Sequence, residues 1–201
     1  MITVVLASKS PRRSQLLALV GIPHRAVPSG APEEAVAGET PRDHVARLAE
    51  AKASTVAAGC DDGQLVIGAD TIVVLDGDVM GQPKDEEEAR GMLRRLSGRT
   101  HTVLTGVCLM RKGRAPAMGV SESRVTFHRL SEEEVCWYVG TGEPMDKAGA
   151  YAAQGVGAVF LRSIDGSFHN VVGFPLDLFY RLLPDVGLSL AEIRRGPSHS
   201  A

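Results

Sequence analysis

Residues 6–17, LASKSPRRSQLL, join the end of an expected strand to the start of an expected helix. The run Ile2–Leu6 that leads into this stretch is short, apolar and rich in β-branched residues, which is typical of a buried strand. Ser10 occupies the position of a helix N-cap and Pro11 the first helical position. The stretch therefore predicts a sharp strand-to-helix turn close to the N-terminus.

The start of that helix is a candidate anion-binding site. Backbone N–H groups in a first helical turn lack partners within the helix, and the helix dipole is positive there. Arg12 and Arg13 add two permanent charges, and side chains of a first turn lean back toward the N-terminus. With Ser8, these arginines are predicted to bind a phosphate group. The alternative is that Ser8 and Ser10 only cap the helix and that the arginines are solvated surface charges.

The composition limits the class of protein. The chain has 201 residues, of which 44% are hydrophobic and 23% charged, enough to bury a sizeable core. We expect one two-lobed domain over residues 1–190 and a flexible tail over residues 191–201. A formal net charge of −2 argues against nucleic-acid or anionic-membrane partners. Three cysteines without metal-ligand spacing, and no apolar run long enough for a membrane span, indicate a cytoplasmic protein.

Strands and helices alternate along the rest of the sequence, and two of the strands form a meander. This order predicts an α/β fold with a mixed, twisted β-sheet flanked by helices. The strands are expected at residues 24–28, 65–75, 102–110, 120–128 and 158–164. The helices are expected at residues 40–56, 86–96, 132–139 and 176–183.

An acidic residue, Asp70, stands in the middle of the apolar strand 65–75. Burying an unpaired carboxylate costs several kcal/mol, so its presence there needs a reason. An acid at a strand end in an α/β protein is often part of the site. The alternative is that Asp70 caps a neighbouring helix or pairs with an arginine. The helix 40–56 carries Lys52 on an alanine-rich surface.

Two later segments carry further candidates. Pro83 biases Gln82 to an extended conformation, so Gln82 and Lys84 are expected to face the same region. Residues 140–155 are polar, rich in glycine and too long for an ordinary connector, which predicts a binding loop. Lys147 in this loop fits a surface charge equally well, and Asn170 fits a turn terminator.

Five stretches in this order resemble the Maf family of nucleoside-triphosphate pyrophosphatases, also described as septum-formation inhibitors. They are residues 6–17, 68–73, 81–84, 146–155 and 164–176. The resemblance implies a two-lobed α/β fold of the Maf and ITPase type, with the nucleotide in a cleft between the lobes, a divalent cation and often a homodimer. Members of this family hydrolyse nucleoside triphosphates to the monophosphate and pyrophosphate.

The string DKAGAY at residues 146–151, with Gln154 and Gly155, is similar to the branch of the family that acts on dTTP and UTP rather than on 7-methyl-GTP. By this resemblance Asp70 is the catalytic base, and Arg12, Thr71 and Gln154 are tied to substrate choice. The amide of Gln154 offers a donor and an acceptor, which suits the O4 and N3–H edge of thymine or uracil.

The reaction implied is attack of water on the α-phosphorus, with pyrophosphate leaving. Catalysis of this transfer depends mainly on positioning and charge stabilisation. The cations expected to supply it are Arg12, Arg13, Lys52 and Lys84. Glu33 or Glu34 would join Asp70 in holding Mg²⁺ or Mn²⁺, because these hard cations prefer oxygen ligands. The alternative for the two glutamates is that they are solvated acids.

One position departs from the family pattern, since Gln82 stands where lysine normally precedes Pro83. The lost charge is predicted to weaken a triphosphate contact by about 1 to 2 kcal/mol unless Lys84 compensates. The alternative function is therefore a nucleotide-binding regulator of cell division that hydrolyses little. A P-loop NTPase and a zinc or thiol hydrolase fit less well, because the sequence lacks a Gly-Lys-Ser/Thr loop and clustered histidines and cysteines.

Overall fold

The computed structural model describes residues 2–194. Within these residues the strands form one seven-stranded mixed sheet. Its strand order is β2-β1-β3-β5-β6-β7, and β4 pairs with β3. The chain divides into two compact units: unit 1 spans residues 1–70, 105–121 and 173–201, and unit 2 spans residues 71–104 and 122–172. Strands β3 (Gln64–Leu75), β5 (Thr100–Arg111) and β6 (Ala117–Phe127) contribute residues to both units. The predicted mixed α/β sheet is confirmed.

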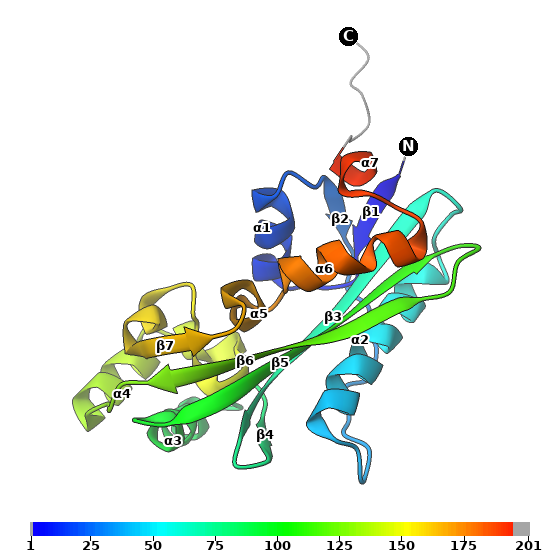
Figure 1. The fold of residues 1–201 in the computed structure, drawn as a ribbon. Coiled ribbons are helices and arrows are strands. Elements are labelled where there is room, and N and C mark those ends of the chain that lie inside the picture. Colours follow the sequence, from blue (N-terminus) through cyan, green and yellow to red (C-terminus); the bar gives the residue numbers. More distant parts are fainter. Residues whose placement is uncertain (1, 195–201) are drawn as a thin grey trace. The chain divides into compact units, whose positions relative to one another are not determined.

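Unit 1 is built around β1 (Thr3–Leu6), which pairs in parallel with β2 (His24–Ala26) and with β3. Figure 1 shows helix α2 (Pro41–Ala57) on one side of these strands, with α1 (Pro11–Leu19) and α6 (Leu176–Leu182) on the other. Strands covered on both faces read as continuous apolar runs, as residues 4–7 and 65–67 do.

Two glycines let α2 approach the strands of unit 1 at backbone contact. A Cβ atom on Gly68 would lie 2.1 Å from the carbonyl oxygen of Ala49, and one on Gly106 would lie 2.2 Å from that of Val45. Neither position accepts a side chain unless α2 moves. Because residues two apart in a strand share a face, Asp70 lies on the same face of β3 as Gly68, beneath α2.

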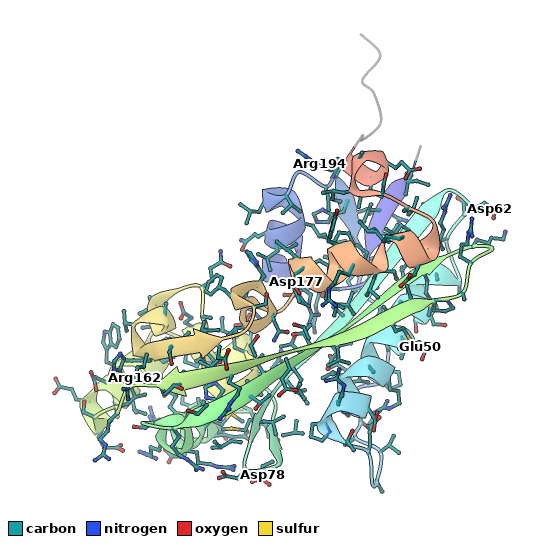
Figure 2. The ribbon with its side chains drawn as sticks, in the orientation of Figure 1. Glu50, Asp62, Asp78, Arg162, Asp177 and Arg194 are labelled. Atoms are coloured by element: carbon teal, nitrogen blue, oxygen red, sulfur yellow. The ribbon has the colours of Figure 1, made fainter. Side chains whose placement is uncertain are left out.

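Unit 2 contains three α-helices: α3 (Glu86–Leu96), α4 (Glu132–Gly140) and α5 (Phe168–Val172). Its edges carry β4 (Asp78–Met80), antiparallel to β3, and β7 (Leu161–Asp165), antiparallel to β6. Asp76 and Gly77, which join β3 to β4, both have positive φ, 55° and 89°, as a two-residue hairpin turn of this type requires. Asp78, labelled in Figure 2, follows this turn and accepts a hydrogen bond from Arg95 Nη2 at 2.7 Å.

Two expectations about the C-terminal third are wrong. The strand expected at 158–164 begins only at Leu161, because Val156–Phe160 forms the 3-10 helix η3. A flexible tail was expected to begin at residue 191. Instead, Leu190–Arg194 forms helix α7, in which Ile193 is buried. Residues 195–201 of that expected tail lie outside the described residues. Among residues 2–194, no helix has the length and apolarity to cross a bilayer.

Candidate active site

The turn between β1 and α1 is organised by Ser8. Its buried hydroxyl oxygen accepts hydrogen bonds from the Ser10 backbone N–H at 3.1 Å and from Arg13 Nη1 at 3.2 Å. Arg13 Nε also donates to the carbonyl oxygen of Gly173 at 2.9 Å. Ser10 is the N-cap residue and Pro11 the first helical residue, as predicted. The Ser8 hydroxyl and the Gly173 carbonyl therefore hold one of the two predicted arginines at the start of α1.

Lys52 joins two carboxylates in unit 1. Its Nζ lies 2.6 Å from Asp70 Oδ1 and 2.7 Å from Glu33 Oε1. The Lys52 and Asp70 side chains are each only 9% exposed, whereas Glu33 is 64% exposed. Lys52 is buried together with Ala49 and Ala53 on the alanine-rich side of α2, where Gly68 leaves room for the backbone of that helix.

The charges of Asp70 and Glu33 also act on Arg13. Burial lowers the pKa of Arg13, the charge of Asp70 opposes that shift, and the charge of Arg12 adds to it. Partial burial alone would raise the pKa of Glu33, but the hydrogen bond and charge of Lys52, helped by Arg13, hold it below its usual value. We call Arg13, Glu33, Lys52 and Asp70 the charge cluster.

The charge cluster provides two oxygen ligands that fit a hard divalent cation. Glu33 Oε1 and Asp70 Oδ1 lie 2.7 Å and 2.6 Å from the same Lys52 Nζ, so the ammonium itself occupies the position that the two carboxylates share. Mg²⁺ is usually bound through one or two carboxylates together with phosphate oxygens and water. Within residues 2–194 there is no group of three or more His, Cys, Asp or Glu arranged to hold a metal. Glu33, rather than Glu34, is the glutamate that the structure places beside Asp70.

The remaining candidates belong to unit 2. Thr71 follows Asp70 in β3 and is half-buried. Gln82 is exposed and its Nε2 donates to the backbone carbonyl of Asp146 at 3.2 Å, which joins it to the predicted binding loop. Lys84 is exposed, and its backbone N–H donates to a carboxylate oxygen of Glu88 at 2.7 Å. Gln154 is exposed near the end of the loop.

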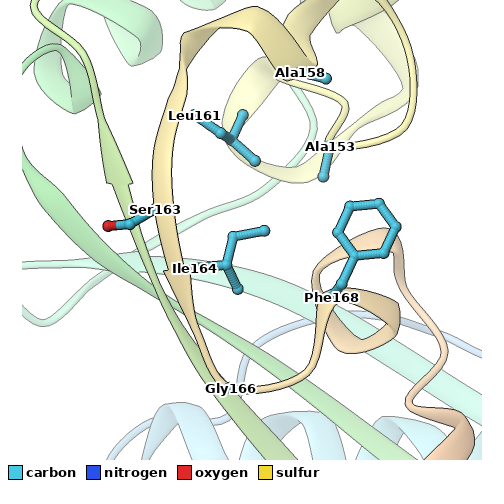
Figure 3. Close-up of a pocket in the computed structure, with 7 residues that line it drawn as sticks. All are labelled: Ala153, Ala158, Leu161, Ser163, Ile164, Gly166 and Phe168. Atoms are coloured by element: carbon cyan, nitrogen blue, oxygen red, sulfur yellow. The ribbon is translucent and has the colours of Figure 1, made fainter.

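A pocket of about 430 Å³ lies beside the Gln154 segment of unit 2. Figure 3 shows the Phe168 ring facing Ala153, with Ile164 across the opening. The residues that line it are Ala153, Ala158, Leu161, Ser163, Ile164, Gly166 and Phe168. Sequence reasoning did not find this pocket, because its residues are small or apolar and resemble ordinary core positions.

Sequence reasoning also missed Glu143. Its carboxylate accepts hydrogen bonds from the backbone N–H groups of Val156 and Gly157, both at 2.9 Å. The only sequence signal was a glutamate before Pro144 in a glycine-rich loop, and this signal does not separate a residue that anchors the loop from a solvated acid. Lys147, for which a surface charge was one reading, is half-buried and donates to the Glu143 carbonyl at 2.7 Å.

The chain is similar in sequence to known proteins over most of its length. The model of the family described as Maf-like protein matches residues 3–186. The dTTP/UTP pyrophosphatase of Anaeromyxobacter dehalogenans (strain 2CP-C) is 49% identical, over 93% of this chain and 95% of the relative. That of Symbiobacterium thermophilum is 50% identical, over 92% of this chain and 94% of the relative. The solved Ham1 protein of Staphylococcus aureus is 13% identical with a TM-score of 0.46, covering 76% of this chain and 87% of that one. The family match and these sequence identities, which extend over nearly the whole chain, show that the protein belongs to the Maf family.

Proposed function

We propose that this protein hydrolyses dTTP and UTP to the monophosphate and pyrophosphate. The observation that carries the proposal is the charge cluster, in which Lys52 contacts a buried and a solvent-exposed carboxylate, and the charge of Asp70 acts on Arg13 at the start of α1. Relatives at about 50% identity are named dTTP/UTP pyrophosphatases, which supports the same chemistry here.

The residues of unit 1 have distinct roles in this proposal. Arg12, Arg13 and Lys52 offset the negative charge of the phosphates, and the positive end of the α1 dipole adds to them. Asp70 orients the attacking water and takes its proton. Lys52 holds the Asp70 carboxylate in place through the 2.6 Å hydrogen bond.

Glu33 and Asp70 would hold Mg²⁺ or Mn²⁺ through carboxylate oxygens. A divalent cation at this position supplies positive charge to the phosphate oxygens. A homodimer, a cytoplasmic location and a single two-lobed domain over residues 1–190 are further proposals that follow from the family resemblance.

Substrate choice is assigned to Arg12, Thr71 and Gln154. The Gln154 amide would pair with the O4 and N3–H edge of uracil or thymine. The neighbouring pocket has the size and the mainly apolar lining of a small-ligand site, which suits a pyrimidine ring.

One assay tests the proposal. The protein is incubated with dTTP, UTP, CTP, GTP or 7-methyl-GTP, with and without Mn²⁺, and pyrophosphate and orthophosphate are measured separately. We expect the unmodified protein to release pyrophosphate from dTTP and UTP. The Asp70→Asn variant should still bind nucleotide but lose turnover by orders of magnitude. Near-normal turnover in this variant would exclude Asp70 as the catalytic base.

The second candidate function is a nucleotide-binding regulator with little hydrolysis. It is favoured by Gln82, which replaces a charged residue of the family pattern and whose amide is engaged by the Asp146 carbonyl. Tight binding of dTTP or UTP without release of pyrophosphate would support this function over the enzymatic one.

A further inference from the structure

Two side chains of unit 2 bind the backbone on both sides of Gln154. Tyr138, at the end of α4, donates its hydroxyl proton to Glu143 Oε1 at 2.8 Å. The same hydroxyl oxygen accepts the N–H of Ala152 at 3.0 Å. The Glu143 carboxylate accepts the N–H groups of Val156 and Gly157 at 2.9 Å each. We call this arrangement of Tyr138 and Glu143 the loop clamp.

Two glycines show how closely the segment packs on the loop clamp. A Cβ atom on Gly155 would lie 2.4 Å from Glu143 Oε2, and one on Gly157 would lie 2.4 Å from the Tyr138 hydroxyl. Only glycine allows the backbone to approach these polar atoms so closely. The hydrogen bonds and the missing side chains therefore fix the backbone immediately before and after Gln154.

The loop clamp combines a buried aromatic ring with a charged acceptor. Tyr138 is fully buried and packs edge-to-face against Phe160, with ring centroids 5.2 Å apart. Burial alone would raise the pKa of Glu143, but the N–H groups of Gly157 and Val156 hold it below its usual value. Glu143 is therefore ionised near neutral pH, and hydrogen bonds to a charged acceptor are stronger than neutral ones.

A glutamine by itself does not distinguish uracil from cytosine. Uracil presents an acceptor at O4 and a donor at N3, whereas cytosine presents a donor at N4 and an acceptor at N3. Rotation about the last torsion of the glutamine exchanges its oxygen and its NH₂ group, so the free amide matches either base. Discrimination between uracil and cytosine therefore has to come from contacts that hold the Gln154 segment and its surroundings in one arrangement.

We propose that Tyr138 and Glu143 are positioning residues that hold the Gln154 segment so that the amide meets uracil and thymine but not cytosine. This inference rests on the proposed role of Gln154 in reading the base. The loop clamp acts through the backbone of residues 152–157, while Gln154 itself remains exposed to meet a ligand.

The test compares Glu143→Ala, Glu143→Gln and Tyr138→Phe with the unmodified protein. Glu143→Ala is expected to lower the ratio of kcat/KM for UTP to that for CTP by about tenfold or more. Glu143→Gln keeps an oxygen acceptor and should restore part of the ratio. Tyr138→Phe loses only the hydroxyl contacts to Glu143 and Ala152, so this variant tests the same proposal if Glu143→Ala does not fold. The inhibition constant of inorganic tripolyphosphate, which has no base, should stay the same in all three variants.

Hydrogen exchange provides a readout independent of activity. The amides of Ala152, Val156 and Gly157 should exchange faster in Glu143→Ala, while β5 stays protected. Glu133→Ala, which removes an exposed glutamate from α4, is the matched control and should change neither the exchange nor the UTP-to-CTP ratio.

The two proposals fail in different ways. If the unmodified protein releases no pyrophosphate from UTP, the proposed function is wrong. If the unmodified protein discriminates between UTP and CTP but folded Glu143→Ala and Tyr138→Phe keep that ratio, the inference about the loop clamp is wrong. A loss of kcat that is equal for both substrates would also overturn it, because that result indicates a structural role alone.

Discussion

Replacing Gly68 with alanine tests whether backbone contact between α2 and β3 sets up the charge cluster. The new Cβ would lie 2.1 Å from the Ala49 carbonyl oxygen and 2.7 Å from the Ala53 nitrogen. Both atoms belong to the α2 backbone, so no flexible side chain can turn away, and the helix must move by about 1 Å. Overpacking of this kind costs about 1–3 kcal/mol, so the free energy of unfolding should fall by that amount.

The same displacement should affect activity more than stability. Lys52 lies one turn after Ala49 in α2, on the same side of the helix. A shift of about 1 Å would lengthen its 2.6 Å contact with Asp70 beyond hydrogen-bond distance. Misplacement of a catalytic group by about 1 Å costs roughly 100-fold in rate. Urea unfolding would measure the stability, and pyrophosphate release from UTP would measure kcat/KM.

Gly91→Ala in α3 is the matched control. A Cβ atom on Gly91 meets no atom of the described chain within 4 Å, and alanine favours a helix over glycine by about 0.8–1.0 kcal/mol. This variant should be at least as stable as the unmodified protein and equally active. If Gly68→Ala matched Gly91→Ala in both stability and kcat/KM, close contact of α2 with β3 would not be what positions Lys52.

Three further predictions concern charges. Lys84→Ala should lower kcat/KM for UTP more than Gln82→Ala, since Lys84 carries the charge that Gln82 lacks; equal or reversed effects would contradict compensation. Glu33→Gln should raise the Mg²⁺ concentration for half-maximal rate several-fold, and an unchanged metal requirement would exclude Glu33 as a ligand. Hydrogen bonding by Arg47 lowers the pKa of Glu39 from 4.5 to about 2. Because this folded-state pKa is depressed, the stability from Glu39 is present above pH 4.5 and lost as the pH falls toward 2. Glu39→Gln should flatten the pH dependence of the unfolding free energy in that range, and an unchanged slope would contradict this assignment.

Elements set by local chemistry could be predicted from the sequence. Thr40 caps α2, and its hydroxyl accepts the Asp43 N–H at 3.1 Å. Ser131 and Glu134 form a capping box at the start of α4. These features depend on residues at most three positions apart, so the sequence alone carries the information.

Contacts between distant segments could not be predicted in this way. Arg13 and Gly173 are 160 residues apart, and Lys52 and Asp70 are 18 apart. Asn170, which fitted a turn terminator, is fully buried and donates to the Val103 carbonyl at 3.0 Å. A glycine inside an apolar strand is a usable signal of close backbone approach, and Gly68 carried that signal two residues before Asp70.

The charges near Asp70 are the reason why we expect the proposed enzyme to need a divalent cation. Arg12, Arg13 and Lys52 bring three positive charges, and Glu33 and Asp70 return two negative charges to the same region. A nucleoside triphosphate carries several negative charges, so these residues alone leave most of its charge uncompensated. Glutamine in place of lysine at position 82 removes another cation from the family pattern. Lys52 offsets only one of the two carboxylate charges, and a divalent cation between the carboxylates and the phosphates would make both carboxylates favourable for binding. Their place beside Lys52 is therefore better explained by metal-dependent phosphate chemistry than by binding of an anion alone.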